Sequence, residues 1–138
     1  MKKYLLPLLA LLSFSGVNAA DNVTDLTDAT MLTKVYDYKT GKTVSTRPAV
    51  IDLWAPWCGP CRRLAPVVDS LAVEYDGRVD FYKVNVDNNP DISRAFRVQS
   101  IPMLLLIPTD GGRPRYIVGL HPSETLRTAI DDILLKKQ

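Results

Sequence analysis

Residues 50–61 read VIDLWAPWCGPC and hold both cysteines of this 138-residue chain, Cys58 and Cys61. The apolar run before the cysteines and the amphipathic run after them predict a strand, a tight turn and the start of a helix. A thiolate at a helix N-terminus meets unpaired backbone N–H groups and the positive end of the helix dipole, which lowers its pKa. We therefore expect Cys58 to attack disulfides, and Cys61 to attack the mixed disulfide that results.

Two other uses of a cysteine pair compete with this redox interpretation. A zinc site needs about four ligands, whereas the chain has two cysteines and one histidine, His121. We therefore expect no metal. A purely structural disulfide remains an alternative in an exported protein, although closing so short a loop removes little entropy from the unfolded chain.

Residues 1–20 have the pattern of a secretory signal peptide. A basic MKK start is followed by a mainly apolar run at 4–14 and by the small-residue cleavage pattern VNA at 17–19. The apolar run is too short to cross a bilayer comfortably. Because the signal looks bacterial, we expect one domain, residues 21–138, in the periplasm and without a membrane anchor.

The charges of the predicted mature domain balance. The whole chain has 17 basic and 15 acidic residues, and removing Lys2 and Lys3 leaves 15 of each. Dispersed charges without an excess of one sign do not form the basic footprint of a nucleic-acid or membrane-surface binder. We therefore expect no nucleic-acid partner, and we also expect a monomer without a cofactor.

The remaining pattern alternates between strands and helices. Residues 50–55 are apolar on both faces except at Asp52, which predicts a central strand covered on both sides. Alternation predicts parallel pairing through crossovers, and the turn at 109–114 predicts a final hairpin. The expected fold class is α/β, with one mixed central sheet of four to five strands flanked by helices on both faces. The polar segment 37–48 is compatible with a loop or a hairpin. We predict strands at 21–25, 50–55, 79–86, 103–107 and 116–118, and helices that begin near Thr27 or Asp28, after Cys58, near Pro90 and at Pro122.

Several landmarks along this layout occur in the same order in thioredoxins. The chain resembles that family from about Val23 onward, which implies the thioredoxin fold. A C-G-P-C motif within these flanks is far more specific than C-x-x-C alone. The landmarks are VIDLWAPWCGPC at 50–61, KVNVD at 83–87, Asn89-Pro90, Ile101-Pro102 and Val118-Gly119.

The resemblance implies distinct roles within the motif. It makes Cys58 the exposed attacking thiol and Cys61 the buried resolving thiol, with Gly59 and Pro60 tuning the pair. Proline between the cysteines is typical of reductases in this family, whereas protein disulfide isomerases usually have histidine there. We therefore expect the dithiol to donate electrons.

Asp52 corresponds to the family's buried carboxylate near the resolving cysteine. Burial raises a carboxyl pKa, so Asp52 would accept the proton of Cys61 when that thiol must attack. Lys83 matches the lysine that pairs with this carboxylate and tunes it. The alternatives are a solvated aspartate at the strand end and a lysine that extends out of the sheet to water.

Pro102 matches the family's cis-proline opposite the cysteines. This geometry would present the backbone of Ile101 to an extended substrate strand. Trp57, Ile101 and Gly119 would then form a flat apolar patch around Cys58. Ordinary core and turn positions, with a trans proline, are the alternative.

We therefore expect an exported protein-disulfide reductase that acts on disulfide-containing exported proteins. Cytosolic thioredoxin reductase cannot reach such an enzyme, so we expect a membrane-embedded thiol electron donor. Disulfide-introducing relatives carry a large helical insertion, for which the 40 residues between Cys61 and Pro102 leave no room. A cytochrome-maturation thiol reductase and a non-catalytic binding module or holdase remain alternatives.

Overall fold

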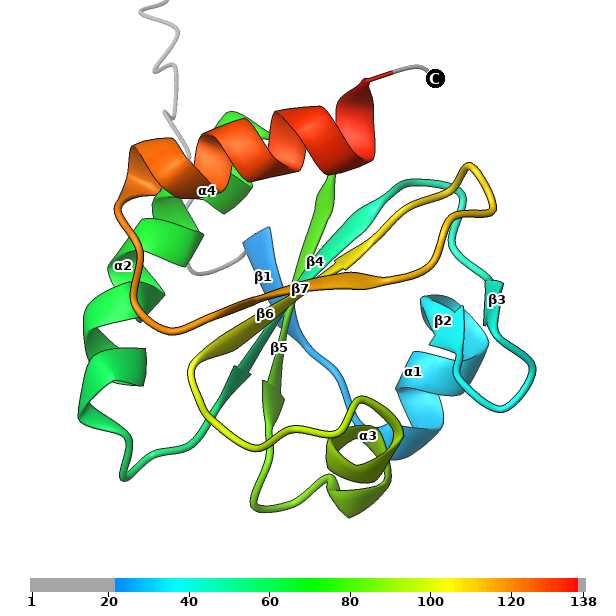
Figure 1. Cartoon of the computed structure of the whole chain (residues 1–138), viewed down its shortest axis with the longest axis horizontal. Helices are drawn as coiled ribbons and strands as arrows, with labels where there is room; N and C mark the ends of the chain where they lie inside the picture. Colours follow the sequence, from blue (N-terminus) through cyan, green and yellow to red (C-terminus); the bar gives the residue numbers. More distant parts are fainter. Residues whose placement is uncertain (1–21, 137–138) are drawn as a thin grey trace, which may run out of the picture.

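The structure is a computed structural model that describes residues 22–136. The predicted signal peptide, residues 1–20, lies outside the described residues. A five-stranded sheet stands between two layers of helices, as Figure 1 shows. Within residues 22–136, no helix combines the length and the apolar character needed to cross a bilayer.

The sheet has the predicted mixed topology, with the strand order β1-β5-β4-β6-β7. β1, β5 and β4 pair in parallel, and β6 pairs antiparallel with both β4 and β7. β4 is therefore central, with a neighbour on each side. The strands are β1 (Val23–Asp25), β4 (Ala49–Trp54), β5 (Asp80–Asn85), β6 (Met103–Ile107) and β7 (Arg115–Val118).

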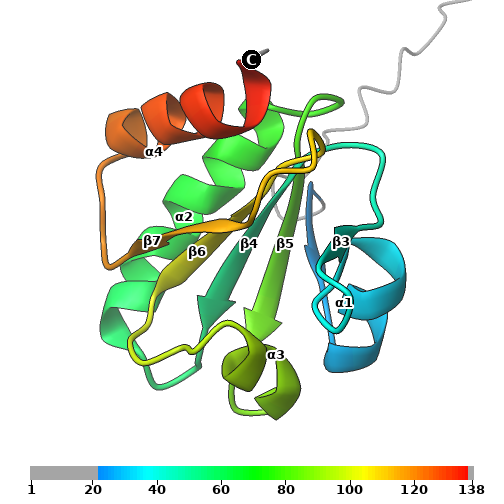
Figure 2. The same cartoon turned by 45° about the vertical axis from the view of Figure 1, so that its right-hand side comes forward.

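Helices cover both faces of the sheet, as predicted (Figure 2). One face carries α2 (Gly59–Glu74) and α4 (Ser123–Ile130), which continues as the π-helical turn η2 (Asp131–Leu135). The other face carries α1 (Asp28–Lys34) and α3 (Pro90–Ala95). The layers sandwich β4, which explains its nearly continuous apolar sequence.

Alternation along β4 divides its side chains between two hydrophobic cores. Val50 packs in the core with α2 and α4, whereas Ile51 and Leu53 pack in the core with α1 and α3. Successive side chains of a strand point to opposite faces. Asp52, in phase with Val50, therefore faces α2.

The polar segment 37–48, for which the sequence is compatible with a loop or a hairpin, contributes to a small hairpin. β2 (Tyr36–Asp37) and β3 (Lys42–Thr43) pair antiparallel, separately from the main sheet. The Asp37 carboxylate accepts the N–H of Lys39 at 2.9 Å and the hydroxyl of Thr40 at 2.7 Å. Gly41 closes the turn at φ 73°, a conformation that suits glycine. Turn chemistry within the segment thus favours the hairpin.

Asp28 connects the starts of α1 and α3. Thr27 caps α1 in a capping box, which leaves the neighbouring carboxylate free for another helix. Asp28 accepts the backbone N–H of Ile92 at 2.8 Å and of Asp91 at 3.2 Å. Its own N–H donates to Asn89 Oδ1 at 3.0 Å. A carboxylate from a distant part of the chain thus supplies the cap that α3 lacks.

Replacing this carboxylate is expected to destabilise the fold. Asp28→Ala leaves two N–H groups of α3 without their acceptor, which should lower the free energy of unfolding by about 1–2 kcal/mol. Urea unfolding measures the loss. Asp76→Ala, at an exposed turn after α2, is the matched control and should change stability by less than about 0.5 kcal/mol. Equal losses in the two variants would contradict the role of Asp28.

Candidate active site

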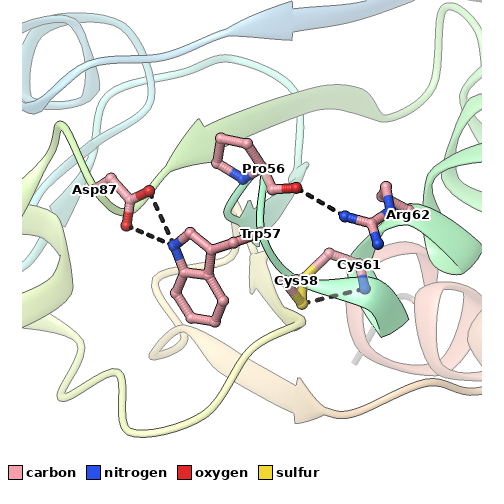
Figure 3. Close-up of a disulfide and its surroundings, with 6 residues drawn as sticks. All are labelled: Pro56, Trp57, Cys58, Cys61, Arg62 and Asp87. Atoms are coloured by element: carbon pink, nitrogen blue, oxygen red, sulfur yellow. Dashed lines mark hydrogen bonds between the residues drawn. A yellow bond between two sulfur atoms is a disulfide. The ribbon is translucent and has the colours of Figure 1, made fainter.

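Cys58 lies at the junction of the β4 loop and α2, as the sequence predicts. It is the N-cap of α2, and Gly59 and Pro60 are the first helical residues. Proline fits there because the first N–H groups of a helix have no partner within it. Cys58 and Cys61 form a disulfide, with their Cα atoms 5.3 Å apart. Cys58 Sγ also accepts the backbone N–H of Cys61 at 3.2 Å (Figure 3).

Both cysteines are largely covered in this oxidised form. Cys58 keeps 5% of its surface exposed and Cys61 keeps 2%. They pack with Ala55, and Trp54 and Ile101 lie against this cluster. The expectation of an exposed Cys58 is therefore wrong for the disulfide state, because these neighbouring side chains cover it. An incoming sulfur has only a narrow line of approach.

Hydrogen bonds fix the loop that precedes Cys58. The indole Nε1 of Trp57 donates to the two carboxylate oxygens of Asp87 at 3.1 and 3.2 Å, although the side chain is 67% exposed. Arg62 reaches back from α2 and donates to the carbonyl of Pro56 at 2.8 Å. Figure 3 shows Asp87 on the side of the indole away from the disulfide. Asp87 closes the KVNVD landmark, but its spacing from Trp57 carries no sequence signal for this contact.

The Ile101–Pro102 peptide bond is cis, as the resemblance implies. Ile101 lies against the disulfide cluster. Trp57 and Ile101 line a groove of about 360 Å³ beside it, together with Val86, Ser93, Val98, Gln99 and Ser100. We call this the active-site groove.

Gly119 does not line the active-site groove. Its N–H instead donates to the carbonyl of Pro102 at 2.8 Å, so it supports the cis-proline loop. Its φ of 93° is disfavoured for residues with a side chain. The predicted patch thus brings together Trp57 and Ile101, with Gly119 in a supporting position.

Asp52 is buried between the sheet and α2. Only 5% of it is exposed, which excludes the solvated alternative. It lines a cavity of about 210 Å³ together with Cys61, Trp54 and Lys83. Within residues 22–136, neither Asp52 Oδ1 nor Trp54 Nε1 has a hydrogen-bond partner. Buried polar atoms usually have a partner, so these two are exceptions that invite a functional explanation.

The electrostatics of this cavity favour the protonated carboxyl. Burial, the largest cause, and the nearby charge of Asp69 raise the pKa of Asp52, and the charge of Lys83 opposes them; together they give a pKa of about 7. Lys83 is the direct neighbour of Asp52 in the pairing of β4 with β5. No salt bridge joins the two among the described residues. Lys83 therefore acts on Asp52 as a neighbouring charge.

The buried carboxyl makes stability depend on pH. Its pKa is about 7 in the folded state and about 3.8 unfolded, so the folded state holds the proton more tightly. The protonated Asp52 carboxyl makes its full contribution to the free energy of unfolding below pH 3.8, and this contribution is lost as pH rises to about 7. In Asp52→Asn the loss is absent. The stability of the variant relative to the wild type should rise by on the order of 3 kcal/mol between about pH 4 and pH 8.

Urea unfolding of the oxidised proteins at a series of pH values measures this difference. Asp76→Asn serves as the control, because Asp76 is exposed at the end of α2. Its stability should follow the wild-type curve at every pH. Parallel curves for Asp52→Asn and the wild type would show that folding does not raise the pKa of Asp52.

Comparisons with known proteins agree with the fold and with this site. The thioredoxin family model matches residues 27–132. A thioredoxin of Borreliella burgdorferi is 44% identical over 110 residues, covering 78% of this chain and 93% of the relative. Thioredoxin 1 of Synechococcus elongatus is 42% identical over 106 residues, covering 77% and 92%. Thioredoxin M4, a chloroplastic protein of Arabidopsis thaliana, is 36% identical over 118 residues, covering 86% of this chain and 57% of the relative.

The matched region contains the disulfide, its helix and the cis-proline loop. Taken with the five-stranded sheet and the Cys58–Cys61 bond, these comparisons show that the chain belongs to the thioredoxin family and is a thiol–disulfide oxidoreductase.

Proposed function

We propose that this protein reduces the disulfides of exported proteins by two-step exchange through Cys58 and Cys61. The observation that carries the proposal is the Cys58–Cys61 disulfide at the start of α2, beside the active-site groove. A disulfide in that position is one state of a two-state redox pair. It favours turnover over a purely binding role.

The reaction begins from the dithiol. The Cys58 thiolate attacks one sulfur of the substrate disulfide, and the other substrate sulfur leaves and takes up a proton. Cys61 then loses its proton and attacks Cys58 Sγ, which releases the second substrate sulfur as a thiol. The substrate gains two electrons and two protons, and the enzyme is left with the Cys58–Cys61 disulfide.

Position explains why Cys58 attacks first. As the N-cap of α2, its sulfur lies beside the Cys61 N–H and the positive end of the helix, and both favour a thiolate. Cys61 lies within the first turn and is the more buried of the two. It therefore resolves the mixed disulfide.

Asp52 is proposed to accept the proton of Cys61. A carboxyl with a pKa of about 7 exchanges protons readily at neutral pH. Asp52 and Cys61 line the same cavity of about 210 Å³, which is large enough to hold a water molecule that relays the proton. Lys83 tunes this carboxyl through its charge.

The substrate is proposed to bind across the active-site groove. Trp57, held by Asp87, offers an exposed ring, and Ile101 contacts the disulfide cluster. An extended substrate segment would pair with the backbone of Ile101 next to Pro102. Gly119 supports this loop by its hydrogen bond to Pro102.

Export to the periplasm is proposed from the composition of residues 1–20. A reductase there, acting as a monomer, needs electrons from the cytoplasmic side. We therefore propose a membrane-embedded thiol carrier as the donor and disulfide-containing exported proteins as the acceptors.

Paired serine variants test the exchange mechanism. Cys58→Ser should reduce insulin disulfides at least about 100-fold more slowly than the wild type, because the attacking sulfur is missing. Cys61→Ser should also fail to turn over but should accumulate mixed disulfides through Cys58, detectable by non-reducing electrophoresis. Equal insulin reduction by Cys58→Ser and the wild type would instead favour a binding module.

Cell fractionation with determination of the N-terminus tests the location, and trapping of thiols in intact cells tests the electron supply. The mature N-terminus should lie near residue 20 or 21 in a periplasmic fraction. Cys58 and Cys61 should be alkylated as free thiols when the membrane carrier is present, and should be found as a disulfide when it is deleted. A protein that stays oxidised in both strains would overturn the proposed donor, and a full-length cytoplasmic protein would overturn export.

A further inference from the structure

A larger groove adjoins the active-site groove. It has a volume of about 740 Å³ and shares two lining residues, Gln99 and Ser100, with the active-site groove. We call it the side groove. Its other walls come from the β2–β3 hairpin, the end of α3 and β7, which can be followed in Figure 1. The two grooves are therefore neighbours, separated only by the residues that they share.

The side groove is lined with aromatic rings. Tyr36, Tyr38, Phe96 and Tyr116 all contribute to it, and Tyr116 is 64% exposed. Tyr116 lies on β7, which is an outer strand of the sheet. Exposed aromatic side chains beside an open strand edge are typical of surfaces that bind other polypeptides.

The charges of the side groove have one sign. Arg97 and Arg113 line it, and no aspartate or glutamate does. Neither arginine forms a salt bridge among residues 22–136. The predicted mature domain has equal numbers of acidic and basic residues. Asp110 and Asp132 line a neighbouring pocket together with Arg113, and burial together with the charges of Asp28, Asp91 and Asp37 raises the pKa of Tyr38. The excess of positive charge is therefore confined to the lining of the side groove. Its complement is an acidic partner.

The backbone conformation at Arg97 also indicates that its side chain has a functional role. Arg97 follows the end of α3 at φ 51°, in the left-handed region where helix ends favour glycine. A side chain strains the backbone in this region. Stability alone would therefore favour glycine, and the cationic side chain at this strained position points to a function in the groove.

We propose that the side groove binds an acidic segment adjacent to the reactive cysteine of a protein substrate. Acidic side chains of this segment pair with Arg97 and Arg113, and its apolar or aromatic side chains pack on the rings. The substrate cysteine then lies in the active-site groove next to Cys58. This inference rests on the proposed disulfide-reductase function and adds a substrate class to it.

Two disulfide-bonded peptides test the inference. They have the same residues next to the cysteines, and differ only in flanks, on both sides, that carry glutamate and aspartate in one peptide and glutamine and asparagine in the other. The rate constant for their reduction by the dithiol enzyme is followed by tryptophan fluorescence. The acidic peptide should react about three- to tenfold faster at low ionic strength. This advantage should fade at about 0.5 M salt.

Arginine variants assign the effect to the side groove. The double variant Arg97→Gly, Arg113→Gln should lose the preference for the acidic peptide and keep the wild-type rate for the neutral one. Glycine suits the backbone conformation at position 97, so Arg97→Gly should not lower the temperature of thermal unfolding. The control is Arg115→Gln, which removes one charge from β7 at an exposed position outside the side groove, in a pocket that Arg115 shares with Arg113, Asp110 and Asp132. It should keep the preference.

Several outcomes would overturn the inference. These are equal rates for both peptides with the wild type, loss of the preference in Arg115→Gln, and equal slowing of both peptides in the double variant. A dimer in sedimentation that the double substitution dissociates would assign the groove to a second copy of the chain. If the wild type reduced neither peptide, the proposed reductase function itself would fail, which is a distinct result.

Discussion

Side-chain alternation along β4 controls both the fold and the site. The strand lies at the centre of the sheet and packs in both cores, so a shift of one residue would exchange its apolar side chains between the two faces. The same register directs Asp52 toward α2 and ends the strand where the loop to Cys58 begins. The carboxyl and the two sulfurs therefore meet because one strand and the following helix pack against each other.

Burial of Asp52 lowers the stability of the fold but serves the proposed function. A carboxyl without a hydrogen-bond partner for one oxygen, and without a salt bridge among the described residues, is costly to ionise. That cost is also the reason why its pKa reaches about 7. The neighbouring Lys83 limits the cost without removing it. An apolar residue at position 52 would suit the core better, and the proposed proton transfer explains why an acid is present.

Much of this architecture could be predicted from residue patterns, because strong signals coincide in it. Apolar runs, proline positions and turn residues placed all five strands of the sheet, with ends that differ by at most two residues from those observed. The contact between Asp28 and α3 could not be predicted. Thr27 and Asp28 are equally good caps for α1, and the sequence does not show which of the two side chains is free to contact another helix. The sequence also did not predict that neighbouring side chains cover Cys58. It depends on Ile101 and Trp54, which reach the disulfide through tertiary packing rather than local spacing.

The cap from Asp28 and the pairing of Val23 with Phe81 bind the beginning of the domain to residues near its middle. A chain that leaves the ribosome or a membrane channel N-terminus first therefore has no partner for its first strand until β5 and α3 have emerged. Contacts of such long sequence separation cannot form early. The first strand thus remains unpaired, and accessible to proteases and chaperones, until β5 has emerged.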